Sequence, residues 1–165
     1  MKVTDWLATQ FDQEMKTTRR HLERLPGDKF DWRPHEKSYT AGALASHIVE
    51  CVPWTTKIFT ANEYNFDAAT YKPYLATSTD DLLQTFERGV ADSKRVLAEL
   101  DDEAGLESWS LKVNGHVLFE RPRFDVFRDL TMSHLIHHRG QFSVYLRLLN
   151  IPVPSTYGPT ADEKS

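Results

Sequence analysis

The stretch TMSHLIHHRGQFSVYLRLLN, residues 131–150, decides the fold and holds the first candidate site. Its apolar residues recur every three or four positions, which is typical of an amphipathic helix with one buried face. His134 and His138 are four residues apart, so both imidazoles lie on that face, one above the other. Because burying an unpaired polar group is costly, we expect these histidines to have partners elsewhere in the chain.

Three further helical patterns precede this one, and turn signals separate them. The four patterns span residues 3–25, 41–62, 78–100 and 121–150. Pro53 lies inside the second pattern and predicts a kink near residues 49–53, because proline removes a backbone hydrogen bond. Residues 63–78 are rich in tyrosine and show neither the helical nor the strand period of apolar residues, which predicts an irregular connection.

A change of period follows the third pattern. Short apolar runs flank Asn114-Gly115, a dipeptide that favours a two-residue hairpin turn. The sequence therefore predicts an all-α fold, a four-helix bundle with a small β-hairpin between the third and fourth helices. Connections of about 15 residues favour at least one crossover, and the length of 165 residues suits a single domain over residues 1–165.

Composition excludes several classes of protein. The net charge of −4 and the lack of a basic run argue against nucleic acid as a partner. No apolar stretch approaches the length that spans a bilayer, and residues 1–20 lack the apolar core of a signal peptide, so we expect no membrane partner. A single cysteine, Cys51, excludes an internal disulfide, and the chain is expected in the cytoplasm.

A third histidine lies on an apolar helical stripe. His47 belongs to the second helix, and it can converge with His134 and His138 if the two helices face each other. Three imidazoles that bind one metal ion leave a coordination position open for chemistry. Spacing alone leaves a metal-free, hydrogen-bonded cluster as the alternative. No glutamate follows His134, so this is not the HExxH helix of metalloproteases.

Other residues near this triad have weaker claims. Glu50 and Gln141 are the catalytic candidates, since each lies one turn from a proposed ligand. Cys51 is interpreted as a small buried residue and Arg139 as an ion-pair partner between helices or subunits. The four remaining histidines are interpreted as surface or loop residues: His21, His35, His116 and His137.

The chain also resembles a known family. The run HIVE at 47–50, HLIHHRGQ at 134–141, WRP at 32–34 and the ending PVPSTYGPTADE at 152–163 are similar to the DinB/YfiT-like metal-dependent enzymes. The resemblance implies an up-down-down-up bundle, a homodimer, and a divalent metal on a histidine triad that carries over to His47, His134 and His138. The family name refers to a damage-inducible gene and does not imply DNA binding.

Two classes of function remain open. As an enzyme with a small-molecule substrate, the protein is expected to bind zinc or nickel, with iron or manganese as alternatives. Thiol-dependent relatives favour S-transferase chemistry with a low-molecular-weight thiol, while metal-bound water would make the protein a hydrolase. The other class is a non-catalytic metal-binding protein of the stress response, in which a fourth protein ligand closes the site.

Overall fold

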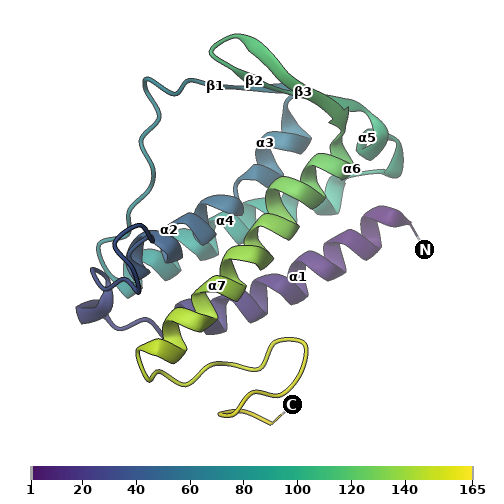
Figure 1. The fold of residues 1–165 in the computed structure, drawn as a ribbon. Helices are drawn as coiled ribbons and strands as arrows, with labels where there is room; N and C mark the ends of the chain where they lie inside the picture. Colours follow the sequence, from purple (N-terminus) through teal and green to yellow (C-terminus); the bar gives the residue numbers. More distant parts are fainter. Residues whose placement is uncertain (1, 165) are drawn as a thin grey trace.

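The computed structural model describes residues 2–164, most of which are helical (Figure 1). In chain order the elements are α1 (Val3–Leu22), η1 (Gly27–Lys29), α2 (Ala41–Cys51), α3 (Trp54–Thr60), β1 (Glu63–Phe66), α4 (Thr79–Glu99), α5 (Asp102–Leu106), β2 (Ser108–Val113), β3 (His116–Pro122), α6 (Arg123–Val126), η2 (Phe127–Ser133) and α7 (His134–Leu148). None of these helices is long and apolar enough to cross a membrane.

The long helices pack as a bundle around one apolar core. Helix α1 packs against α4, and α2 packs against α7 and α4 (Figure 1). Phe11, Ile48 and Phe142 come from three different helices, and each is 0% exposed. The four helical patterns of the sequence are thus confirmed over most of their lengths, since their apolar faces meet in this core.

The second pattern is broken rather than kinked. Helix α2 ends at Cys51 and α3 begins at Trp54, with Pro53 between them. Thr40 caps α2 as a threonine should, because its side chain accepts a hydrogen bond from Ala43 N. Pro53 cannot donate to the preceding turn, so the helix restarts there in a new direction. The sequence predicts a kink near residues 49–53, and the structure shows an interruption of the helix at residues 52 and 53.

The start of the fourth helix was predicted wrongly. Strand β3 continues through Pro122, and the helix begins at Arg123 instead. Residues Phe127–Ser133 then form a π-helix before the α-helix resumes at His134. A π-helical segment turns the following side chains to a different side from the one that a continuous α-helix would give. The direction of His134 and His138 depends on this segment.

A three-stranded sheet corrects the all-α prediction. The hairpin of β2 and β3 is confirmed, and its turn residues Asn114 and Gly115 have φ values of 50° and 83°, as a type I′ turn requires. The sequence predicts an irregular connection over residues 63–78, and this prediction is wrong for strand β1, Glu63–Phe66. It pairs in parallel with β2, with Tyr64 opposite Leu111. Four residues with a partner so distant in the chain leave little local signal.

Candidate metal centre

Three histidines meet where α2 faces the junction of η2 and α7. The ring centroids lie 5.0 Å apart for His47 and His134, 4.6 Å for His47 and His138, and 4.7 Å for His134 and His138. Helix α2 packs against α7, and the four-residue spacing stacks two rings on the facing side. The structure therefore brings together the three side chains that the sequence selected.

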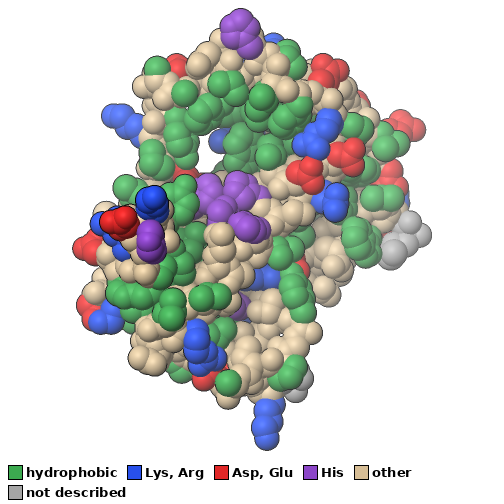
Figure 2. Space-filling model, viewed as in Figure 1, with side chains coloured by type: hydrophobic (Ala, Val, Ile, Leu, Met, Phe, Trp, Pro, Cys, Tyr) green, Lys and Arg blue, Asp and Glu red, His purple; other side chains and the backbone are tan. Residues whose placement is uncertain are grey.

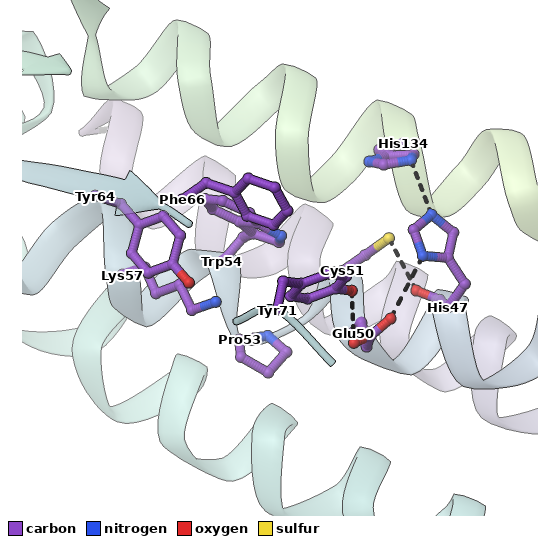
Figure 3. A pocket seen from close by; sticks show the side chains of 10 residues that line it. All are labelled: His47, Glu50, Cys51, Pro53, Trp54, Lys57, Tyr64, Phe66, Tyr71 and His134. Carbon is purple, nitrogen blue, oxygen red and sulfur yellow. Dashed lines mark hydrogen bonds and ion pairs between the residues drawn. The ribbon is translucent and has the colours of Figure 1, made fainter. Parts of the chain in front are cut away.

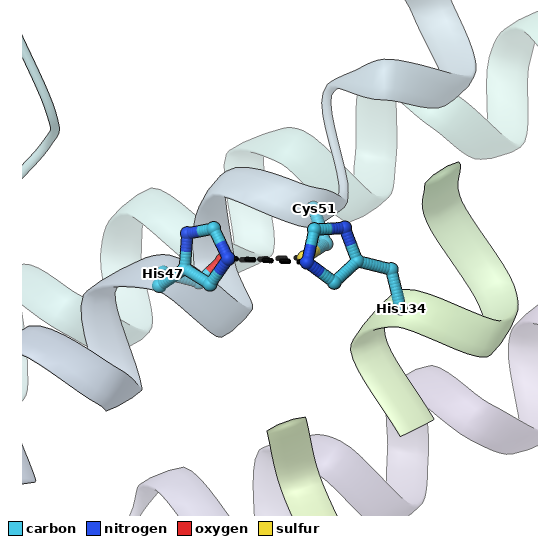
Figure 4. Close-up of side chains that lie close together, drawn as sticks. All are labelled: His47, Cys51 and His134. Carbon is cyan, nitrogen blue, oxygen red and sulfur yellow. Dashed lines mark hydrogen bonds between the residues drawn. The ribbon is translucent and has the colours of Figure 1, made fainter. Parts of the chain in front are cut away.

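Two of these rings point nitrogen to nitrogen. His47 Nε2 lies 3.2 Å from His134 Nε2 (Figure 4). Ligand bonds of about 2.0–2.1 Å in a tetrahedral zinc site place two nitrogens about 3.3 Å apart. The observed separation fits both a direct hydrogen bond and one edge of a metal site. When both rings are neutral and protonated at Nδ1, each Nε2 carries a lone pair and no proton. A metal ion can then bind both Nε2 atoms, whereas a direct hydrogen bond between them cannot form.

Oxygen acceptors engage the other ring nitrogens. Gln141 Oε1 lies 2.8 Å from His138 Nδ1, and Glu50 Oε2 lies 3.6 Å from His47 Nδ1. Acceptors in these positions fix the tautomer and orient the imidazoles of metal sites. Both catalytic candidates of the sequence, Glu50 and Gln141, thus lie beside the triad in positions suited to orienting it.

Two of the rings stay neutral at physiological pH. Burial lowers the pKa of His134, and the proximity of the His47 ring adds to that effect. Burial likewise lowers the pKa of His138 to about 4, against the opposing hydrogen bond to Gln141. A neutral imidazole offers a lone pair to a metal, whereas an imidazolium does not. The donor set is therefore ready to bind a divalent cation without first losing protons from these two rings.

Cys51 competes for a place in the donor set. Ligand atoms of His47, Cys51 and His134 all lie within 4.8 Å of one another. Among residues 2–164 this is the one group of three that meets this distance, and it includes Cys51 in place of the predicted ligand His138. The Cys51 thiol is buried, donates to the His47 carbonyl oxygen at 3.3 Å, and has its pKa raised by burial to about 12. The thiol is thus protonated at neutral pH, so a metal would have to displace its proton.

Glu50 carries a compensated negative charge. Burial raises its pKa, but the nearby His47 ring and the hydrogen bonds from the Tyr74 backbone and the Tyr71 hydroxyl outweigh that effect and lower the pKa overall. Its Oε1 accepts from Tyr71 Oη at 3.0 Å and from Tyr74 N at 2.9 Å. The carboxylate is therefore ionised and held in place, with its second oxygen directed to His47.

A cavity of about 320 Å³ opens beside the histidines (Figure 3). In the space-filling view, histidine side chains gather at the edge of a hollow on this face (Figure 2). The cavity is lined by His47, Glu50, Cys51, Pro53, Trp54, Lys57, Tyr64, Phe66, Tyr71 and His134. The sequence did not identify the aromatic wall or Lys57. The unexplained tyrosines of residues 63–78 were the one available signal, because loop aromatics often line sites that a rigid scaffold positions.

Comparison with known proteins agrees with this arrangement. Residues 1–164 match the family model described as the DinB family. The chain belongs to the DinB family. It is 25% identical over 166 residues to the uncharacterised protein YrdA of Bacillus subtilis (strain 168), covering 96% of this chain and 90% of that one.

Solved structures of DinB-like proteins share the fold. One from Bacillus cereus ATCC 10987 superposes with a TM-score of 0.74 at 20% identity, covering 94% of this chain and 98% of that chain. Another, YjoA of Bacillus subtilis, gives a TM-score of 0.68 at 20% identity, covering 96% and 99%. The mixture of a helical bundle and a small sheet is thus the architecture of a DinB-like protein.

Outside the cluster, one histidine of this DinB-family chain was interpreted wrongly. His35, His116 and His137 are exposed as expected, but His21 is only 1% exposed. Its Nδ1 donates to the Thr17 carbonyl oxygen at 2.9 Å, so local helix geometry satisfies the ring without a partner that sequence spacing would reveal. 

Arg139 links two helices of the bundle. Its guanidinium is 2% exposed, lies 2.6 Å from Glu14 Oε2 on α1, and donates to the Tyr157 hydroxyl at 2.9 Å. Glu14 Oε1 accepts from the same hydroxyl at 2.8 Å. The ion-pair interpretation of Arg139 is confirmed within the chain, between α7 and α1, and the C-terminal segment completes it.

Proposed function

We propose that this protein is a metal-dependent enzyme that acts on a small molecule in the cavity beside the histidines. His47, His134 and His138 hold a divalent metal, with zinc or nickel preferred because imidazole nitrogen suits both ions. The family resemblance extends the proposal to a homodimer of up-down-down-up bundles. The observation that carries the proposal is that the three imidazole rings have centroids 4.6–5.0 Å apart, with oxygen acceptors beside the outer nitrogens of His47 and His138.

Thiol S-transferase chemistry suits this cavity best. A bound divalent metal would supply a Lewis acid that lowers the pKa of a coordinated thiol or water. Cys51 is protonated and directs its proton to the His47 carbonyl oxygen, so it is a poor nucleophile. The reactive sulfur is therefore that of a low-molecular-weight thiol. Glu50 keeps His47 in one tautomer, and the aromatic wall excludes water from the reacting sulfur.

Hydrolysis is the second candidate. The ionised Glu50 carboxylate lines the cavity and could take a proton from water. Both of its oxygens, however, already face Tyr71, Tyr74 and His47. A carboxylate held in this way is better suited to positioning His47 than to moving a proton.

Metal analysis of matched variants tests the donor set. Elemental analysis of the wild type, His134→Ala, His138→Ala and Cys51→Ser is expected to find metal in the wild type and in Cys51→Ser only. If His138→Ala keeps the metal and Cys51→Ser loses it, the ligands are His47, Cys51 and His134. A site closed by Cys51 in addition to the triad would favour the non-catalytic alternative.

Activity of the metal-loaded protein separates the two reactions. The transferase proposal expects metal-dependent conjugation of glutathione or cysteine to monochlorobimane, followed by fluorescence. The hydrolase alternative expects metal-dependent release of nitrophenolate from 4-nitrophenyl acetate without added thiol. His134→Ala is the control in both assays, and activity that survives this substitution contradicts a role for the metal.

A further inference from the structure

Lys57 is a cation of the cavity without an acidic partner. It projects from α3, is half-buried, and lies in the cavity lining. Within residues 2–164, no carboxylate lies within 4.0 Å of its ammonium group, whereas Lys94 and Lys112 each pair with an acid. Lys57 is also the single lysine or arginine of the lining. Its positive charge is therefore not neutralised by an acidic side chain of the described residues.

Two aromatic rings hold this ammonium in place. Lys57 Nζ lies 4.6 Å from the centroid of the Trp54 ring and 4.5 Å from that of Tyr64. The two rings themselves pack edge to face, 5.2 Å apart. Cation–π contacts fix a lysine without neutralising its charge. The side chain is thus ordered in advance, which reduces the entropy lost when it binds a ligand.

The Glu50 carboxylate of the cavity already has partners, whereas the Lys57 ammonium has no acidic partner among the described residues. Glu50 is engaged by Tyr71, Tyr74 and His47, so it does not neutralise Lys57. A cationic ligand would meet the ammonium on the ring faces of Trp54 and Tyr64, where like charges repel. The electrostatics of the lining therefore select an anion.

The space between the two ends is apolar. Lys57 lies with Tyr64 at one end of the lining, and His47 and His134 lie at the other (Figure 3). Phe66 and Tyr71 lie between them, with ring centroids 4.9 Å apart. Such walls can pack against the apolar groups of a ligand.

We propose that the small-molecule ligand of this cavity carries a carboxylate that binds Lys57 and an apolar body that packs on Phe66 and Tyr71. A carboxylate is favoured over a phosphate because the lining offers one cation, which matches a single negative charge. The inference rests on the proposed function, since it places the reacting end of the ligand near the histidines. Lys57 is then the residue that determines specificity for the anion.

Calorimetry with two matched probes tests the proposal. The probes are 3-phenylpropanoate and its uncharged analogue 3-phenylpropanamide, titrated into the metal-loaded wild type. We expect the anion to bind at least about tenfold more tightly, the scale of one charge-assisted hydrogen bond. Lys57→Gln should lose this preference, and Lys72→Gln, which removes an exposed charge outside the lining, should keep it.

His134→Ala separates Lys57 from the metal as the anion's partner. A preference for the anion that persists in this variant and disappears in Lys57→Gln supports the proposal. Equal affinities in the wild type, an undiminished preference in Lys57→Gln, loss of the preference in His134→Ala, or no binding of 3-phenylpropanoate each overturns it. Metal content is measured on the same samples, so failure of the metal centre itself is seen separately from failure of the anion site.

Discussion

Replacing Glu50 with glutamine tests how this protein supports its metal ligands. The substitution keeps an oxygen that can accept from Tyr71 and Tyr74, so the loop contacts of 3.0 and 2.9 Å can persist. What it removes is the negative charge that faces His47 Nδ1. Zinc affinity is therefore expected to fall while the fold remains intact.

The size of the effect follows from the geometry. Loss of such an outer partner costs about 10–100-fold in metal affinity. Glu50 Oε2 lies 3.6 Å from His47 Nδ1, which is longer than an ordinary hydrogen bond. The expected loss therefore lies at the lower end of that range, about tenfold, or about 1.4 kcal/mol.

Competition with a chromophoric chelator measures the zinc dissociation constants of wild type and variant. Glu87→Gln is the matched control, because Glu87 pairs with Arg19 on the far side of the bundle and should leave zinc affinity unchanged. If Glu50→Gln binds zinc as tightly as the wild type, Glu50 does not support the metal. A loss far beyond about 100-fold would instead make Glu50 a ligand in its own right.

Three further predictions concern stability and its dependence on pH. A Cβ at Gly105 would lie 1.9 Å from Phe124 Cζ, so Gly105→Ala should lower the free energy of unfolding by about 1–3 kcal/mol. A Cβ at Gly140 meets no atom within 4 Å, so Gly140→Ala should raise that free energy by about 0.5–1 kcal/mol, because alanine favours the helix. Urea denaturation measures the free energy of unfolding of both variants. Similar effects of the two substitutions would contradict the close packing at Gly105. Arg139→Met leaves the buried Glu14 charge without its ion-pair partner and should lower the free energy of unfolding by about 3–5 kcal/mol. Adding Glu14→Gln to this variant should recover part of the lost stability. A loss no greater than that of Arg95→Met, which breaks an exposed ion pair, would refute a stabilising role for the buried pair. Burial lowers the pKa of His21 below its ordinary 6.5, and the charge of Arg139 adds to this. Protonation therefore favours the unfolded chain, and stability is lost as the pH falls below 6.5. His21→Gln should show a smaller loss between about pH 7 and about pH 5, and identical pH profiles would refute the burial of a neutral ring.

Much of the helical bundle could be predicted from the sequence. Helical period and turn signals are local properties, and they located helices close to α1, α2 and α4 as well as the Asn114-Gly115 hairpin. Period also placed His134 and His138 on one face. Their meeting with His47 required knowing which helices are neighbours, and the family resemblance supplied that expectation before the packing of α2 on α7 was seen.

Other features exist only because distant segments meet. Strand β1 gains its hydrogen-bonded partner from residues far along the chain. The π-helix before His134 turns the ligand face, and no signal in residues 127–133 indicated it. Cys51 and His47 share α2, and Lys57 and Trp54 share α3, but His134 and Tyr64 join these two pairs from other segments of the chain.

The sequence by itself determined the helices, the hairpin turn and the residue types that suit a metal site. These depend on backbone preferences and on periods of a few residues, which each short stretch carries within itself. Only the tertiary structure decided which ring nitrogens face one another and what lines the cavity beside them. The His47–His134 contact joins residues 87 positions apart, and burial in a shared core selects it.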